Sequence, residues 1–381
     1  MVQRCSLSRL FLQRSTLRRL SSTRFDEDFL APRKANYVPL SVVSLLKHAA
    51  TNYPNKLAYV HGEIKATWSD TYVRIKKLSS ALAKVGVGRG DVVSIVAPNT
   101  PSMFEAHFAV PGCNGAVLHT VNTRLDHRTI AFQINHAQTK VLIVDSEFGQ
   151  LVRDALSLLP SENSTPLIVD IQDPEFDDSN KSVLCGNGNI MFEEFLGAGD
   201  HENVELSKPN DEFDAIGLNY TSGSTGDPKG VVNHHRGAYL NAISNALELN
   251  MEKFAQYLWI VPMFHCNGWC FPWTMASVAG TSYFLRQVRG DIVIDLIKKW
   301  NIKYLTGAPI VMNIMLQAAD EKGGKYLENF EHTVKFITAG APPPPPGSQL
   351  FAPFVFDSLT SCPLFCIVHY SYQKISRQIR H

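Results

Sequence analysis

The sequence predicts an α/β fold of mostly parallel sheets flanked by helices. Two observations carry this prediction. Short apolar runs alternate with segments of helical periodicity from residue 42 onward, and this alternation resumes after a polar stretch at 161–208. Strands that alternate with helices of this length pair in parallel through right-handed crossovers. We therefore expect α/β subdomains at 36–160 and 209–346, with 161–208 as a surface connection between two sheet halves.

The first subdomain follows this alternation closely. The segment 69–85 places Tyr72, Ile75, Leu78 and Leu82 on one side of a helix, and the apolar run 92–96 is typical of a buried strand. The expected helices are 42–50, 69–85, 102–110 and 128–136, and the expected strands are 92–96, 117–120 and 141–144.

The connecting segment is rich in Asp, Glu, Gly, Asn and Ser, apart from an expected strand at 167–169 and an expected helix at 192–195. After it, the expected helices are 237–248, 292–300 and 310–319, and the expected strands are 257–261, 281–286, 304–305 and 334–338. No internal repeat of fixed period is visible.

The bulk composition is ordinary for a globular protein. The chain has 381 residues, of which 45% are hydrophobic and 19% charged, and its formal net charge is +1. This charge gives no electrostatic argument for nucleic acid as a partner. Seven cysteines, an odd number spread over a long chain, indicate reduced thiols rather than a disulfide framework. The pairs Cys266/Cys270 and Cys362/Cys366 lack the further ligands of a zinc site, so we interpret them as buried or half-buried thiols.

We expect no membrane span. The most apolar stretch, 350–370, is interrupted by Asp357, Pro353 and Pro363, which would be costly in lipid.

The first 25 residues differ from the rest of the chain. They combine arginine, serine and leucine, and no acidic residue occurs before Asp26. This composition is typical of an organellar transit peptide, and the step at 19–22 resembles a mitochondrial processing site. We therefore expect a mitochondrial protein, with plastid or peroxisome as alternatives, although the chain does not end in Ser-Lys-Leu. A disordered basic tail without an address is the other interpretation.

The most informative segment is 218–230, Leu-Asn-Tyr-Thr-Ser-Gly-Ser-Thr-Gly-Asp-Pro-Lys-Gly. Glycines allow backbone N–H groups to point inward, and Lys229 supplies one cation. The hydroxyl donors are Thr221, Ser222, Ser224 and Thr225. This combination suits a loop that binds a polyphosphate.

The spacing differs from that of the Walker loop, G-x-x-x-x-G-K-[ST]. Counting from Gly223, that pattern needs glycine where Pro228 stands, and Lys229 is followed by Gly230. The segment is therefore either a different phosphate loop or a Gly/Ser-rich surface turn. Its place after a strand favours the loop.

Two further segments accompany the loop: Val-Pro-Met-Phe-His-Cys-Asn-Gly-Trp at 261–269 and Thr-Ala-Gly-Ala-Pro at 338–342. With the run from Leu218 to Lys229, in which every position is filled by an allowed residue type, they make residues 36–346 resemble the adenylate-forming, or AMP-binding, superfamily of acyl-CoA synthetases. The segments 234–239 and 265–273 resemble plant acyl-activating enzymes that take short or medium acids, or benzoate.

The resemblance implies the large N-terminal domain of an acyl-CoA synthetase. It also implies an ATP-dependent acid–thiol ligase, in which a small carboxylic acid attacks the α-phosphate and coenzyme A then attacks the acyl carbon of the acyl-AMP. Repulsion between the two anions must be reduced by Mg²⁺, a lysine and oriented N–H groups.

By resemblance, the loop holds the β- and γ-phosphates, and Thr221 lies near the α-phosphate and the metal. The nucleotide-binding residues implied here are Thr221, Ser222, Gly223, Ser224, Thr225, Gly226, Lys229 and Gly230. Gly340, Ala341 and Pro342 match the turn that contacts adenine, although the residues alone fit a plain strand-ending turn equally well.

The resemblance places His265 beside the acyl carboxylate and the α-phosphate, where with Thr221 and Lys229 it would be catalytic. A packed, hydrogen-bonded histidine is the alternative. With His265, the residues Asn267, Gly268 and Trp269 would border the acid pocket, although Trp269 and Trp273 fit plain core positions equally well.

The pattern changes at five consecutive prolines, 342–346. Residues 347–381 lack a clear period, and we interpret them as an atypical, unstructured tail, with a folded cap as the alternative. The sequence contains no Tyr-Gly-x-Thr-Glu motif and no lysine in the context that the family's small C-terminal domain requires. We therefore expect an incomplete domain in a truncated chain that is weakly active or inactive. The alternative is a non-catalytic nucleotide-binding or regulatory isoform. The residues fix neither the acid nor the oligomeric state.

Overall fold

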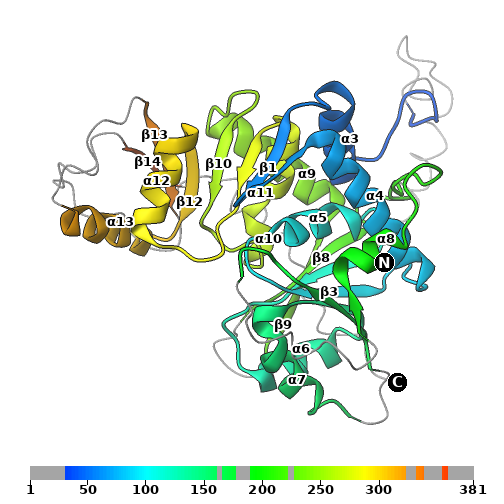
Figure 1. The fold of residues 1–381 in the computed structure, drawn as a ribbon. Helices are drawn as coiled ribbons and strands as arrows, with labels where there is room; N and C mark the ends of the chain where they lie inside the picture. The colour runs from blue at the N-terminus through cyan, green and yellow to red at the C-terminus, as the bar shows by residue number, and fades with distance from the viewer. Residues whose placement is uncertain are drawn as a thin grey trace, which may run out of the picture. The chain divides into compact units, whose positions relative to one another are not determined.

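The computed structural model describes residues 31–160, 165–176, 189–221, 227–322, 332–338 and 354–358. The chain divides into two compact units, Met1–Val38 and Pro39–His381, and all helices and strands named below belong to the second. They form two seven-stranded sheets accompanied by helices (Figure 1). The predicted α/β class with mostly parallel sheets is confirmed.

The helices are α3 (Val42–Asn52), α4 (Trp68–Lys84), α5 (Pro101–Ala109), α6 (His127–His136), the 3₁₀ turn η1 (Ser146–Phe148), α7 (Gly149–Leu156), α8 (Phe192–Gly197), α9 (His235–Glu248), α10 (Cys266–Trp269), α11 (Phe271–Ser277), α12 (Gly290–Trp300) and α13 (Ile310–Glu321). The strands are β1 (Leu57–His61), β2 (Ile64–Thr67), β3 (Val92–Val96), β4 (Val117–Thr120), β5 (Thr139–Asp145), β6 (Leu167–Ile171), β7 (Ile190–Met191), β8 (Ala215–Thr221), β9 (Lys229–His234), β10 (Gln256–Trp259), β11 (Thr281–Tyr283), β12 (Tyr304–Gly307), β13 (Val334–Thr338) and β14 (Phe354–Ser358).

Each sheet is parallel except at one edge. Sheet A has the order β14-β13-β12-β10-β11-β1-β2, and only β2 runs antiparallel to its neighbour. Sheet B has the order β7-β6-β5-β3-β4-β8-β9, and only β9 is antiparallel. Because parallel strands end on the same side, the carboxyl ends within each sheet share one edge, where ligands of open α/β sheets bind.

Both sheets combine strands from the two stretches that the sequence separates. Sheet A joins β1 and β2 to β10–β13, and sheet B joins β3–β5 to β8 and β9. The boundaries expected at 160 and 209 therefore do not coincide with the boundaries of the sheets.

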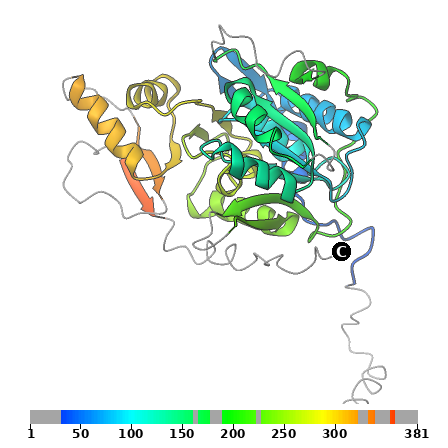
Figure 2. The same ribbon diagram turned by 90° about the horizontal axis from the view of Figure 1, so that it is seen from below.

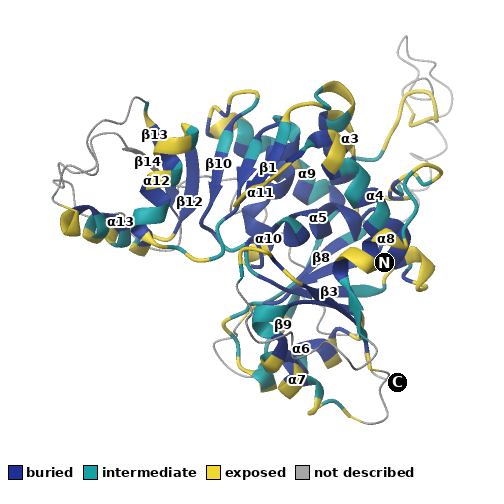
Figure 3. Cartoon of the chain, viewed as in Figure 1, coloured by how far each residue is buried: buried dark blue, intermediate teal, exposed yellow. Residues whose placement is uncertain are grey.

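Three apolar clusters define the layers. The largest combines strands of both sheets, such as β3 and β10, with helices α3, α4, α5, α9 and α11. A second packs α12 and α13 on sheet A, and a third packs α6 and α7 on sheet B. The order of layers is thus helix, sheet, helix, sheet, helix, and the buried residues concentrate in the strands and the central helices (Figure 3).

Several elements differ from the sequence prediction. The β1–β2 hairpin turns at Gly62, whose φ is +55°, and was not predicted; its second strand, β2, is only partly buried and has no apolar run. The segment 161–208 is not only a surface connection, since β6 and β7 extend sheet B. In the expected tail, residues 354–358 form β14, which pairs in parallel with β13 (Figure 2).

Within the described ranges, no helix combines the length and apolar character that a bilayer span requires.

Candidate active site

The ends of the predicted phosphate loop lie on adjacent strands. Thr221 is the last residue of β8 and Lys229 the first of β9, and the two are paired across the antiparallel ladder. Both are exposed. The loop therefore leaves and rejoins sheet B at one point. Ser222, Gly223, Ser224, Thr225 and Gly226 lie outside the described residues, as do Gly340, Ala341 and Pro342.

A second contact fixes the base of this hairpin. The hydroxyl of Tyr220 lies 2.7 Å from Nδ1 of His136 on α6. Burial raises the pKa of Tyr220 to about 12, so the phenol stays neutral at physiological pH. The neighbouring pair on the ladder is Tyr220 and Gly230. A Cβ added to Gly230 would lie 3.1 Å from Cδ1 of Leu218.

The two predicted motifs meet directly. The segment that carries His265 follows β10 of sheet A, and its Phe264 carbonyl accepts a hydrogen bond from Thr120 Oγ1 at 3.0 Å. The same carbonyl accepts from Asn219 Nδ2 at 3.3 Å. Asn219 belongs to β8, two residues before Thr221, so the phosphate loop and the histidine segment are joined across the two sheets.

His265 itself is exposed, and its backbone N–H donates to the Pro262 carbonyl at 3.0 Å. The surrounding protein removes part of the hydration of the ring, and the positive charge of Arg124 adds to this effect. Both lower the pKa of His265 below 6.5. The imidazole is therefore neutral at pH 7 and can donate one hydrogen bond while accepting another.

The backbone after His265 forms a left-handed turn. Residues 266–270 all have positive φ, between 47° and 65°. Only one of them, Gly268, is a glycine, and left-handed helix costs other residues roughly 1–2 kcal/mol each. An added Cβ on Gly268 would lie 2.9 Å from the Trp259 ring. Strain of this kind is concentrated at functional sites.

The side chains of this turn point mostly into the protein. Asn267 is fully buried, and its Oδ1 accepts a hydrogen bond from Asn233 Nδ2 at 3.0 Å. Trp269 and Trp273 both belong to the largest apolar cluster. Cys266 is exposed as a residue, but the surrounding protein removes part of the water around its thiol. This desolvation raises the pKa of the thiol and disfavours the reactive thiolate.

The carboxyl ends of β10, β12 and β13 share one edge of sheet A. The His265 segment follows β10, and the predicted adenine turn follows β13 in the sequence after Thr338. The ends of β10 and β13, which precede the two motifs in the sequence, therefore lie at the same edge of sheet A (Figure 1).

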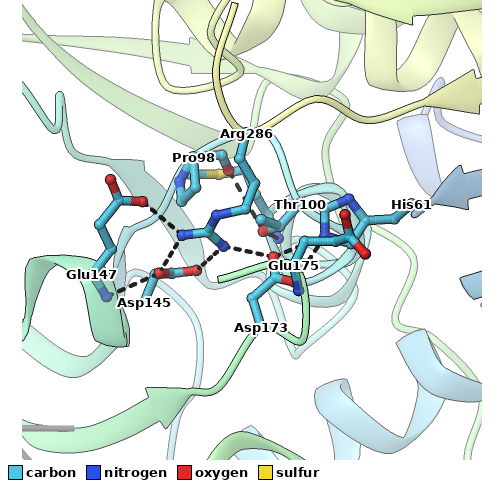
Figure 4. Close-up of polar contacts among 9 residues, drawn as sticks. His61, Pro98, Thr100, Asp145, Glu147, Asp173, Glu175 and Arg286 are labelled. Carbon is cyan, nitrogen blue, oxygen red and sulfur yellow. Dashed lines mark hydrogen bonds and ion pairs between the residues drawn. The ribbon is translucent and has the colours of Figure 1, made fainter. Parts of the chain in front are cut away.

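Sequence reasoning missed a buried ionic network between the sheets. Arg286, which follows β11, is only 7% exposed and bonds to Asp145, Glu147 and Asp173 at 2.6 to 2.9 Å (Figure 4). His61, the last residue of β1, lies 2.8 Å from Asp173. Burial opposes ionisation of Asp173, but the contacts with His61 and Arg286 prevail and hold its pKa at about 2. Each residue follows or ends a strand, which is the only sequence signal that could have grouped them.

With the fold and the joined motifs described, comparison with known proteins shows the family. The chain belongs to the AMP-binding enzyme family, whose profile matches residues 46–357. It is 44% identical over 331 residues to the acetate/butyrate–CoA ligase AAE7 of Arabidopsis thaliana and 41% identical over 331 residues to the acetate–CoA ligase CCL3 of Humulus lupulus. Each alignment covers 86% of this chain and 57% of the relative. The chain thus spans little more than half the length of these relatives.

Solved structures share the fold. The N-terminal domain of FACL13 from Mycobacterium tuberculosis superposes with a TM-score of 0.70 at 22% identity, covering 84% of this chain and 75% of that one. The luciferase-like enzyme of the mealworm Zophobas morio gives 0.69 at 19% identity, covering 84% and 72%. The expected acyl-CoA synthetase type of N-terminal domain is confirmed.

The comparisons correct one prediction from the sequence. Five Arabidopsis relatives, including AAE7 and a benzoate–CoA ligase 40% identical to this chain, carry the word peroxisomal in their names. The mitochondrial prediction was wrong. An arginine- and serine-rich composition is a weak targeting signal, because it does not show which import receptor recognises the segment. Residues 1–25 lie outside the described part of the chain.

Proposed function

We propose that this chain carries the ATP- and acid-binding site of an acyl-CoA ligase. The observation that supports this best is the contact of Asn219 and Thr120 with the Phe264 carbonyl. Asn219 and Thr221 face the same side of β8, because alternate residues of a strand do. The Thr221 hydroxyl is therefore directed towards the side on which His265 lies.

In the proposed reaction, a carboxylate oxygen of the acid attacks the α-phosphorus of ATP, and the bond to pyrophosphate breaks. The thiol of coenzyme A then attacks the acyl carbon, and AMP leaves. Lys229 and Thr221 would reduce the negative charge that repels the carboxylate. Neutral His265 would donate its N–H to the charge that develops at the acyl and α-phosphate oxygens.

Mg²⁺ would arrive with the phosphates and neutralise part of their charge. Among the described residues, no group of three or more His, Cys, Asp or Glu could hold a metal by itself. The exposed Thr221 hydroxyl is an oxygen donor of the kind that suits an ion bound mainly by substrate phosphates. Residues 222–226, with Lys229 and Gly230, remain our proposed phosphate contacts, and residues 340–342 our proposed adenine contacts.

Short acids are the proposed substrates. The relatives named for acetate and butyrate support this assignment. The packing behind the histidine segment also supports it, since Trp259 and Phe271 are fully buried and Trp269 is 8% exposed. For Asn267, Gly268 and Trp269 we retain the proposal that they form the wall of the acid pocket.

The test is pyrophosphate release by the purified full chain with ATP, Mg²⁺ and acetate, butyrate, hexanoate or benzoate. We expect release that depends on a short acid and falls about 100-fold in His265→Ala, because one lost donor to developing charge costs roughly that much. His48→Ala, an exposed histidine on α3, serves as the control and should behave as wild type. Absence of both acid-dependent release and nucleotide binding would refute the proposal.

The alternative is a non-catalytic nucleotide-binding or regulatory form of the same fold. The same preparation distinguishes it, because such a form would bind ATP in a titration and release no pyrophosphate with any of the acids.

A further inference from the structure

The left-handed turn at 266–270 depends on contacts from a different part of the chain. Within the turn, the Gly268 N–H donates to the His265 carbonyl at 2.9 Å and the Cys270 N–H donates to the Asn267 carbonyl at 3.1 Å. These two bonds close the turn but do not select its hand. Four of its five residues would avoid this conformation by themselves.

Helix α9 supplies one of the outside contacts. The carboxamide of Asn245, a residue that is 6% exposed, donates to the Trp269 carbonyl at 2.9 Å and lies 3.4 Å from Thr274 Oγ1. The Thr274 hydroxyl in turn lies 3.1 Å from the carbonyls of Cys270 and Ala242. The end of the turn is thus tied to α9 and α11 by buried polar groups.

Strand β9 supplies another contact. Asn233, one residue before the end of β9, donates to the Asn267 carboxamide. The same strand begins at Lys229, so one element both bounds the phosphate loop and holds the centre of the turn. Gly217 on β8 lies against both amides, since an added Cβ would be 2.4 Å from Asn233 Oδ1 and 3.0 Å from Asn267 Oδ1.

We propose that Asn245 is a positioning residue for the acid half of the site: through Trp269 and Thr274 it keeps residues 266–270 left-handed and thereby fixes where His265 and the pocket wall lie. This inference rests on the proposed function. Among the described residues, the Asn245 carboxamide donates to Trp269 and Thr274, which belong to the histidine segment and α11, so we expect its effect on the acid rather than on the nucleotide.

The test compares two ligands that share the nucleotide part. AMP probes the nucleotide site alone, and a non-hydrolysable acyl sulfamoyladenosine probes nucleotide and acid sites together. Acetyl, butyryl and benzoyl forms are titrated into the wild-type chain, and the tightest is used. Asn245→Leu keeps the size of the side chain and removes the donor.

We expect Asn245→Leu to weaken the acyl sulfamoyladenosine at least tenfold and AMP less than twofold. Apparent affinity falls in proportion to the population of the competent conformation, so a turn that is left-handed one tenth of the time gives this loss. Thr274→Val, which removes the hydroxyl that contacts Cys270, should act in the same direction. Ser277→Ala removes a comparable hydroxyl bond further along α11, to the Thr274 carbonyl, and should change neither ligand.

A second substitution separates positioning from general packing. Cys266 is exposed and has φ +47°, so glycine there makes the left-handed turn easier without disturbing α9. We expect Cys266→Gly to recover most of the affinity that Asn245→Leu loses. Damage to the packing of α9 would not be repaired by a change at residue 266.

Equal binding by wild type and Asn245→Leu, equal loss of both ligands, or no recovery in the double variant would each overturn the inference and leave the proposed function intact. Failure of the wild-type chain to bind AMP as well as every acyl sulfamoyladenosine would instead refute the proposed function, and the inference with it.

Discussion

Alternate residues of β8 face the segment that carries His265. Gly217 lies against Asn233 and Asn267, and Asn219 donates to the Phe264 carbonyl. Thr221 follows in the same row. Asn219, which precedes the proposed phosphate-binding positions, therefore helps to hold the second motif at the end of β8.

Asn219 offers a direct check of this contact. Asn219→Ala removes hydrogen bonds to the Thr120 hydroxyl and the Phe264 carbonyl. We expect a loss of about 1–3 kcal/mol in the free energy of unfolding, since two hydrogen bonds worth about 0.5–1.5 kcal/mol each are lost while Thr120 still donates to the Phe264 carbonyl. Urea denaturation measures it. Thr120→Ser keeps the hydroxyl and should stay within about 0.5 kcal/mol of wild type, as substitutions that spare such features do. A stable Asn219→Ala would show that the contact is dispensable.

The sequence indicates which residue types form the site but not the direction of each side chain. The glycines, hydroxyls and Lys229 predict a loop after a strand, and β8 and β9 bound it. Asn267, a proposed wall residue two positions after His265, is fully buried, and its carboxamide accepts a hydrogen bond from Asn233. A left-handed backbone reverses which side a residue faces, and no spacing in the sequence signals it.

Among the elements, short apolar runs were the easiest to predict. The strands at 92–96, 117–120 and 334–338 have the expected bounds, because both faces of each are covered and the apolar run coincides with the strand. β9 was not predicted. It is an edge strand with mostly half-buried residues, so it lacks the continuous apolar run that marks a buried strand.

Three elements, α5, α9 and β4, each carry a buried histidine that the proposed reaction does not use. Burial lowers the pKa of His107 on α5 and His235 on α9 to about 4, and that of His119 on β4 to about 3. In the unfolded chain these groups bind protons below about 6.5. The stability that comes from keeping them neutral is therefore complete above pH 6.5 and is lost as the pH falls towards 4.

His107→Phe tests this linkage. Each such histidine contributes roughly 3 kcal/mol to the fall in unfolding free energy between pH 6.5 and 4, at 1.36 kcal/mol per pKa unit. We expect the fall to be smaller by about that amount in His107→Phe, measured by urea denaturation at several pH values. An unchanged pH dependence would mean that folding does not lower the pKa of His107.

At the scale of the whole molecule, polar contacts join the carboxyl ends of the two sheets. Asn99 donates to the Trp259 and Val261 carbonyls and accepts from the Met263 N–H. Asn219 and Thr120 form a second link, and Arg286 forms a third. Arg286 lies more than 100 residues from Asp145 and Asp173, so no local pattern could have predicted this pairing.

Arg286→Met tests the third link. It leaves the buried Asp145 and Asp173 carboxylates without their guanidinium, and we expect a loss of about 3–5 kcal/mol in unfolding free energy. Arg289→Met is the matched control, because Arg289 is 63% exposed and pairs with Asp291 near the surface. Equal stabilities of the two variants in thermal denaturation would indicate that the Arg286 link does not stabilise the fold.

Calorimetric titration of the full chain with α,β-methylene ATP and Mg²⁺ tests most directly whether the hairpin loop between β8 and β9 binds nucleotide. The wild-type chain should bind, and Lys229→Ala should bind roughly 10- to 100-fold more weakly, because a hydrogen bond to a charged group contributes about 1.5–3 kcal/mol. Lys303→Ala, a partly exposed lysine paired with Glu252, should bind as wild type does. A wild-type chain that does not bind, or a Lys229→Ala chain that binds equally well, would contradict the account.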